Sequence, residues 1–424
     1  MLSKYTQKFL AKTPQYSRSY WTKLTTTGAT IEECVQSSLD TLDQKKPDVC
    51  VVLASKSYTL AHYRKLTEEL QSKLEPKCLI GGVVDRVAQV NHGISLLLGF
   101  EEEIVPFTIN DSQDRLKIRN ISVGRWGRVD DTERIKSQSE HIDKVGWKKF
   151  GSVSTPVQTY QLPPGLENKP SLVFTVSDNE PDQLLQALDH HYPDVPKVGI
   201  VGASTPFVTG EPYTLFNSDG NIMGSGIVGF ASYTKADKYF NVQVTHTAME
   251  KMGNPLKITR CRGNIILDLD DGGATGLLLR LIQSGPKLSK DEEFYLEIYP
   301  PGKDENSESD ATVSRITSGD PGRGNMSIDT TADLQAGQVV QFMRKRNLEF
   351  KNVSSDPIEK DNIVFGVSEK DHTIDASPVQ IPDEANVVPD VFGAVSENGV
   401  IVGRSDIPTE ILDVPFSKVT INNF

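Results

Sequence analysis

Two successions of strand, helix, strand and strand, both within the first 235 residues, limit the folds that this chain can adopt. Short runs rich in β-branched residues predict strands, whereas apolar residues three and four positions apart predict an amphipathic helix. The first succession consists of the segments 47–55, 60–74, 77–87 and 92–100. The second consists of the segments 170–178, 180–193, 197–204 and 224–232. The repeated order predicts an internal duplication whose related halves, about 45–110 and 168–235, share one core.

The rest of the chain adds further strands and a helix. Segment 254–285 predicts two strands around a turn at Arg262–Asn264, then a helix with Asp270 or Asp271 as its N-cap. Segment 388–404 predicts two more strands. We therefore predict an α+β fold of mixed, largely antiparallel sheets with packed helices. Its predicted parts are the duplicated N-terminal module and a C-terminal α+β domain, with a boundary between residues 285 and 286.

Composition excludes several classes of protein. Hydrophobic residues make up 37% of the 424 residues, and no apolar run approaches the roughly 18–20 residues that span a bilayer. A net charge of −12 argues against nucleic acid as a partner, because phosphate binding needs clustered basic residues. None of the four cysteines forms a C-x-x-C pair, which leaves a zinc or redox motif unsupported. No H-E-x-x-H or P-loop pattern occurs either, so we expect neither a metal nor another cofactor. So few cysteines fit a reducing compartment better than a disulfide scaffold.

The first 31 residues differ from the rest of the chain. They contain five basic residues and several hydroxyl residues, and the first acidic residue is Glu32. A basic, hydroxyl-rich and amphipathic leader is typical of a mitochondrial presequence. We therefore predict a presequence over residues 1–30 and a location in the mitochondrial matrix. The alternative is the basic tail of a cytoplasmic protein.

Two motifs that suggest ligand sites fail on their context. The segment Gly224–Gly229 spells G-x-G-x-x-G, but a turn precedes it and strand-like sequence follows it. A dinucleotide site needs a strand before the glycines and a helix after them. The segment Asp268–Gly273 begins like a calcium-binding loop, but Gly272 and Leu279 occupy two of the ligand positions. We expect neither site.

Small residues follow two predicted strands and form the candidate ligand site. Gly81 and Gly82 are predicted to form a turn, and Gly202, Ala203 and Ser204 follow the corresponding strand of the second half. Small residues can leave backbone N–H groups accessible to a carboxylate or another small polar group. Further candidate hydroxyl groups come from Thr205 and Thr209. The alternative is a pair of ordinary tight turns.

These segments, in this order, resemble the FIST domain family. The resemblance rests on PDVCVVLAS, CLIGGVVDRV, GISLLLGF, KVGIVGASTPFVTGEPYTLFNSDGNIMGSGIVGFA and PLKITRCRGNIILDLDDGGA, then FYLEIYPP, GNMSIDTTADLQAGQVVQF and VFGAVSENGVIVG. It implies an N-terminal FIST-like domain over residues 31–285 and a C-terminal one over 286–424. The family's Gly-Glu pair corresponds to Glu397–Gly399 with the acid displaced, so no role is carried over. Glu397 is a candidate ligand residue only if it lies beside Gly82 and Ser204.

The resemblance implies a sensory, non-enzymatic module that binds a small molecule such as an amino acid. Some eukaryotic members carry an F-box for ubiquitin ligation, but only about 30 residues precede the module here, so we expect no F-box. An interaction scaffold that binds a protein partner is the second hypothesis. A hydrolase with Ser204 as nucleophile and an unidentified base is the third.

Overall fold

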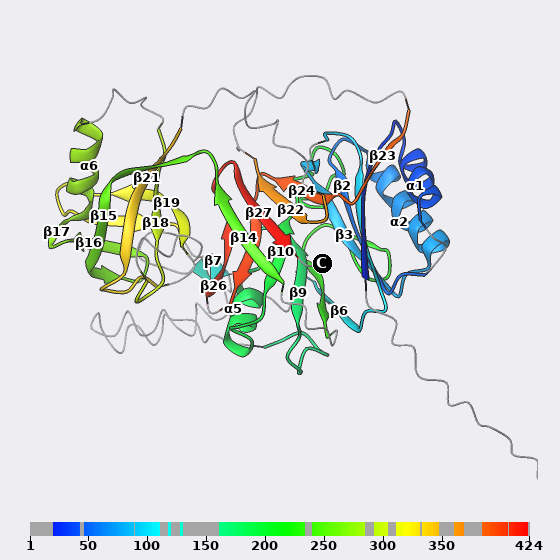
Figure 1. The fold of residues 1–424 in the computed structure, drawn as a ribbon, viewed down its shortest axis with the longest axis horizontal. Coiled ribbons are helices and arrows are strands. Elements are labelled where there is room, and N and C mark those ends of the chain that lie inside the picture. The colour runs from blue at the N-terminus through cyan, green and yellow to red at the C-terminus, as the bar shows by residue number, and fades with distance from the viewer. Residues whose placement is uncertain are drawn as a thin grey trace, which may run out of the picture.

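Three sheets and a small barrel make up the fold in the computed structural model. Helices α1 and α2 lie at one end of the molecule, and α6 lies beside the barrel at the other (Figure 1). The structure describes residues 20–42, 46–88, 90–110, 118–119, 128–129, 161–233, 240–284, 292–303, 311–330, 333–346, 360–368, 384–405 and 407–422.

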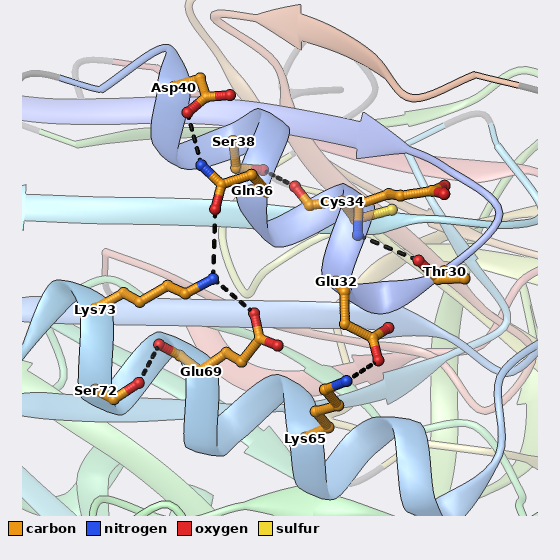
Figure 2. Close-up of polar contacts among 11 residues, drawn as sticks. Thr30, Glu32, Cys34, Gln36, Ser38, Asp40, Lys65, Glu69, Ser72 and Lys73 are labelled. Atoms are coloured by element: carbon orange, nitrogen blue, oxygen red, sulfur yellow. Dashed lines mark hydrogen bonds and ion pairs between the residues drawn. The ribbon is translucent and has the colours of Figure 1, made fainter.

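Sheet 1 has the strand order β12-β11-β3-β2-β5-β1-β23, in which only β2 and β3 are parallel neighbours. Its strands are β1 (Tyr20–Thr27), β2 (Val49–Ser55), β3 (Cys78–Val84), β5 (Ile94–Phe100), β11 (Leu215–Phe216), β12 (Ile222–Met223) and β23 (Asn386–Pro389). Helices α1 (Ile31–Asp40) and α2 (Leu60–Leu74) cover one face of the sheet. Ion pairs and hydrogen bonds join the outer sides of the two helices, among them Glu32 with Lys65 and Gln36 with Lys73 (Figure 2).

Sheet 2 has the order β26-β25-β10-β9-β13-β6, and again only one neighbouring pair, β9 and β10, is parallel. Its strands are β6 (Ile104–Ile109), β9 (Leu172–Ser177), β10 (Lys197–Val201), β13 (Ile227–Ser232), β25 (Val400–Arg404) and β26 (Ile407–Leu412). Helix α5 (Asp182–His191) connects β9 to β10. In both sheets an antiparallel strand, β5 or β13, lies beside the first strand of the parallel pair. The halves thus share one strand order, and their origin by duplication stays a prediction.

Sheet 3 and the barrel complete the described structure. Sheet 3 has the order β14 (Asn241–His246), β27 (Ser417–Asn422), β22 (Ile363–Val367), β24 (Phe392–Ser396) and β4 (Arg86–Val87). The barrel has the order β15 (Met249–Arg262), β21 (Val339–Lys345), β18 (Phe294–Ile298), β19 (Thr312–Gly319), β20 (Met326–Ile328), β16 (Ile265–Leu269) and β17 (Gly272–Gly273), and a β15–β16 pairing closes it. Helix α6 (Ala274–Ser284) packs against it, and a two-stranded ribbon joins β7 (Ile118–Arg119) to β8 (Arg128–Val129).

One apolar core joins the three sheets because their strands alternate inward and outward side chains. In β2, Val51 and Leu53 face the shared core, whereas Val52 faces α1 and α2. Phe174 of β9 and Phe365 of β22 enter the same core. The predicted boundary at 285/286 falls between α6 and β18, so strands from both sides of it build the barrel.

Two local predictions are wrong. Gly81 and Gly82 lie inside β3 and form no turn. The helix begins at Ala274, and neither Asp270 nor Asp271 caps it, because both adopt positive φ angles of 45° and 58°. The Asp270 carboxylate instead accepts the Lys257 N–H at 3.0 Å. The predicted presequence over residues 1–30 includes β1, which pairs with β5 and β23 inside sheet 1, whereas residues 1–19 lie outside the described residues; mitochondrial targeting stays a prediction.

Candidate functional site

The carboxyl ends of the two parallel strand pairs meet at one place, which we call the junction. The Ala203 N–H, just beyond β10, donates to Val83 O of β3 at 2.8 Å. In α/β sheets, ligands bind beyond the carboxyl ends of parallel strands. The junction therefore has the position expected of a ligand site. It comprises Lys56, Asp85, Gly202, Ala203, Ser204, Glu397 and Asn398.

The link between β24 and β25 brings Glu397 to the junction. This segment crosses from sheet 3 to sheet 2, and its Glu397 N–H donates to Asp85 Oδ2 at 2.7 Å. The Asn398 side chain donates to Gly202 O at 2.8 Å, and Gly399 O accepts the Val201 N–H at 3.0 Å. The C-terminal segment is therefore fixed to the ends of both β3 and β10.

Opposite charges lie together at the junction. Asp85 is buried, whereas the Lys56 side chain is 45% exposed, and Lys56 Nζ lies 2.5 Å from Asp85 Oδ1. Burial lowers the pKa of Lys56, but the carboxylates of Asp85 and Glu397 outweigh burial and raise it overall. Lys56 is therefore a stable cation beside the half-exposed Glu397.

The glycines of β3 allow close packing: Gly81 lies against β2 of the same sheet, and Gly82 lies against β11 and against Val176 of sheet 2. A Cβ atom on Gly81 would lie 1.8 Å from Val52 O, and one on Gly82 would lie 3.1 Å from both Thr214 O and Val176 Cγ1. The Leu215 side chain lies against both Gly82 and Gly202, so Gly82 packs next to the junction. Neither glycine offers a turn to a ligand.

The predicted use of free backbone N–H groups is wrong for Gly202 and Ala203. Gly202 N–H donates to Ser177 O and Ala203 N–H to Val83 O, both at 2.8 Å. Both residues are buried, whereas Ser204 is exposed. A ligand at the junction would therefore contact side chains, chiefly those of Lys56 and Glu397.

Thr205 and Thr209 hold the loop that follows. Thr205 is fully buried, and its hydroxyl lies 2.8 Å from that of Thr214 and donates to Glu211 O at 3.1 Å. The Thr209 hydroxyl lies 3.0 Å from that of Thr214. These contacts fix the loop 204–213 internally. At its tip the Phe207 side chain is fully exposed.

A cavity of about 500 Å³ lies at the opposite end of sheet 1, at the start of β2 and β3. It is lined by Asp48, Lys77, Cys78, Glu101, Glu102, Glu103, Ile104 and Pro106. None of the candidate residues lines it. Asp48 is already engaged, because it accepts the Glu102 N–H at 2.9 Å and pairs with Lys77 at 2.5 Å.

The described residues offer no evident metal or thiol chemistry. Within the described ranges, no group of three or more His, Cys, Asp or Glu residues could hold a metal ion. Burial raises the pKa of Cys34 to about 11 and of Cys78 to about 12, so both stay protonated at neutral pH.

None of the helices in the described part of the chain has the length and apolar character to cross a membrane.

Sequence reasoning missed Lys56, Asp85 and Asn398. Lys56 directly follows β2 and Asp85 directly follows β3. The available signal was the position of Lys56 directly after the predicted strand 47–55 and of Asp85 near the end of the predicted segment 77–87. The pattern of small residues points to backbone donors, whereas the structure places charged side chains at the junction.

The chain was compared with known protein families and with curated proteins. The family model described as the FIST N domain matches residues 48–272, which is more than half of the chain. No curated protein matches the chain. The matched residues include every strand and helix that leads into the junction from sheets 1 and 2 except β25.

Proposed function

The chain belongs to the FIST domain family, a family of sensory and ligand-binding domains, and from this premise we propose that it binds a small polar metabolite at the junction. The observation that carries the proposal is the convergence of three chain segments there. Asp85 receives both the Lys56 ammonium group and the Glu397 N–H, and Asn398 binds Gly202 O. Such a site is rigid before any ligand arrives, which lowers the entropic cost of binding.

The charges at the junction favour an amino acid or a similar zwitterion. The half-exposed Lys56 can pair with a carboxylate, and Glu397 can pair with an ammonium group. A ligand with both groups would satisfy both side chains, whereas a simple anion would meet repulsion from Glu397.

Thermal unfolding with each common amino acid tests this proposal. A ligand at about 100 times its Kd raises the free energy of unfolding by about 2.7 kcal/mol, because it binds only the native state. We expect Glu397→Gln and Lys56→Gln to abolish the stabilisation by the amino acid that binds.

A matched control separates the junction from the cavity. Lys65→Gln removes a lysine that pairs with Glu32 on the outer face of α2 and should leave binding unchanged (Figure 2). Glu103→Gln alters the cavity. Loss of binding in Glu103→Gln alone would place the site in the cavity and refute the junction. Absence of stabilisation by every amino acid would refute the ligand class.

Phe207 favours a second candidate function, a docking site for a protein partner. Among the described residues, only two large hydrophobic side chains are exposed, those of Tyr20 and Phe207. Tyr20 is 38% exposed, whereas Phe207 is fully exposed. An aromatic side chain on a fixed loop can anchor an interface, because little entropy is lost when it enters an apolar pocket. We propose that Phe207 enters such a pocket on a partner.

Affinity purification from cells tests the docking site. Phe207→Ser should remove a stoichiometric partner, because it deletes the anchor without touching the threonines that hold the loop. Tyr20→Ser is the matched control, and it should leave that partner bound. Equal recovery of all partners with both variants would contradict the proposal.

We also propose that residues 1–19 direct the protein to the mitochondrial matrix. They contain Lys4, Lys8, Lys12 and Arg18 and no acidic residue. The expected result of deleting residues 1–19 is loss of import with an intact fold, because β1 begins at Tyr20. Fusion of these residues to a fluorescent protein should suffice for import. A cytoplasmic fusion protein would contradict the proposal.

A further inference from the structure

A serine and a histidine outside the proposed ligand contacts form a close pair. Ser57 Oγ lies 2.7 Å from His92 Nδ1. Ser57 stands between β2 and α2, at the carboxyl end of a parallel strand, and His92 lies just before β5. The pairing of β2 with β5 fixes both, and the Ser55 N–H donates to Gly93 O at 3.1 Å. Ser57 is half-buried and His92 is buried.

The neighbours of His92 determine the direction of its hydrogen bonds. His92 Nε2 lies 3.3 Å from Ala29 O, which can only accept, so Nε2 carries the hydrogen. In the neutral ring Nδ1 is then an acceptor, and the Ser57 hydroxyl must donate to it. The Ser55 hydroxyl, 2.8 Å from Ser57 Oγ, supplies the next donor. The network therefore aims the Ser57 proton at the imidazole.

The imidazole is held in place for this contact. The Tyr58 ring lies against it, with ring centroids 4.1 Å apart, and the Tyr58 hydroxyl donates to Gly28 O at 3.1 Å. Burial lowers the pKa of His92, and the Ala29 carbonyl only partly opposes this. The ring is therefore neutral at physiological pH, as a general base must be.

The nucleophile also has a backbone donor of its own. Within the described part of the chain, the Ser57 N–H donates to no backbone acceptor outside the helices and strands, whereas the Tyr58 N–H bonds to the Tyr63 hydroxyl. An N–H group on the nucleophile itself is one of the donors that stabilise an oxyanion in acyl transfer.

We propose that Ser57 and His92 form the catalytic pair of an esterase site. Ser57 Oγ attacks the ester carbonyl carbon while its proton passes to His92 Nδ1. The tetrahedral intermediate then breaks its bond to the leaving alcohol, which takes the proton from His92. Water, deprotonated by His92, attacks the acyl carbon, and Ser57 leaves and regains the proton. The sum is ester plus water giving acid plus alcohol.

The structure also limits the substrate class. Behind the imidazole lies a neutral carbonyl, Ala29 O, where a serine protease has a carboxylate. The imidazolium that forms is therefore less stabilised and a stronger acid. Such a pair suits carboxylic esters of acidic alcohols or phenols and is too weak for amides. Ser204, the nucleophile that the sequence suggested, makes no side-chain hydrogen bond to any described residue.

A fluorophosphonate probe tests the pair directly on the full chain. Ser57 Oγ should displace fluoride from phosphorus, pass its proton to His92 and form a stable adduct that mass spectrometry locates. We expect the adduct on Ser57, and labelling at least about 100-fold slower in His92→Gln. Ser72→Ala, an exposed serine of α2, should label as the natural protein does (Figure 2). Labelling of other serines only, or equal labelling in His92→Gln, would overturn the proposal.

A second variant keeps the test independent of folding defects in His92→Gln. Ser57→Cys preserves the contact with His92 and places a thiol beside the base. That thiol should react with iodoacetamide at least about tenfold faster than an unperturbed thiol at neutral pH, because the adjacent imidazole favours the thiolate. An introduced thiol that reacts no faster than free cysteine would equally overturn the proposal. Neither test uses the ligand of the junction, so their failure would leave the proposed function standing.

Discussion

Single glycines show how closely neighbouring strands approach one another within a sheet. Gly81→Ala would place a Cβ atom 1.8 Å from Val52 O, a backbone atom in the centre of sheet 1. We expect a loss of at least about 3 kcal/mol in the free energy of unfolding, measured by urea denaturation. The control is Gly276→Ala in α6, where a Cβ meets nothing within 4 Å. The free energy of unfolding of that variant should rise by up to about 1 kcal/mol. An equal loss of this free energy in both variants would contradict the close packing of Gly81.

A mostly buried carboxylate, that of Glu410, makes stability depend on pH. Burial raises the pKa of Glu410 to about 7, although Arg404, whose Nη2 lies 3.9 Å from its carboxylate, partly opposes this. The unfolded chain loses the proton near pH 4.5, so ionisation costs stability as the pH rises from 4.5 to 7. Glu410→Gln should therefore stabilise the protein by about 2 kcal/mol at pH 8 and by little at pH 4. Equal effects at both pH values, in matched urea denaturation, would contradict this.

His246 makes folding stability depend on pH in the opposite direction. Burial lowers the pKa of His246 to about 4, and the nearby Arg404 adds to the effect. The unfolded chain takes up the proton near pH 6.5, so the folded protein loses stability as the pH falls from 6.5 to 4. His246→Gln should therefore flatten the stability curve in this range. A curve of unchanged slope would contradict it.

At the scale of elements, the loop 204–213 owes its shape to Thr205. Thr205→Val keeps the side-chain shape but leaves Glu211 O and the hydroxyl of Thr214 without this partner. We expect the free energy of unfolding to fall by about 1–3 kcal/mol. Hydrogen exchange should also become faster at the amides of Val208 and Thr209, which donate to Thr205 O. Thr245→Val, on the exposed side of β14, is the matched control and should change stability by less than about 0.5 kcal/mol.

The elements themselves were largely predictable from sequence. Periodicity predicts α2 with its observed bounds, Leu60–Leu74, and β-branched runs predict β2 and β9. The start of α6 was predicted wrongly because Asp270 and Asp271 lie in a turn with positive φ angles rather than at a helix N-cap. Aspartate is favoured in both places, so the residue type does not distinguish them. The Gly81–Gly82 pair was misread for a similar reason, since glycine marks a turn and a close approach alike.

The assembly of the junction could not be predicted in this way. Glu397 and Asp85 are 312 positions apart, and their contact depends on β24 pairing with β4 while β25 pairs with β10. Local patterns carry no information on which sheet a strand joins. The order of segments in a known family supplied the expectation that they belong to one module.

At the scale of the whole molecule, the two ends of the chain build the same sheets. The C-terminal strands β23 and β25 complete sheets 1 and 2, and Phe365 and Phe392 fill the shared core. We therefore expect a fragment of residues 20–285 to lack a cooperative unfolding transition, as measured by circular dichroism, because its core would be open on one side. A cooperatively folded fragment would instead support the predicted boundary at 285/286.

The pairing of β1 with β23 has a consequence for biosynthesis. Leu24 lies opposite Pro389, so sheet 1 stays incomplete until residues 386–389 have left the ribosome. Contacts between such distant positions slow folding, because the entropy of closing the loop is lost before the contact forms. During this delay the inner faces of β2 and β5 also lack Phe365 and Phe392 of the shared core, which exposes the nascent chain to aggregation. Folding of this protein during synthesis should therefore depend on chaperones that bind the N-terminal half until strands β22 to β25 have been synthesised.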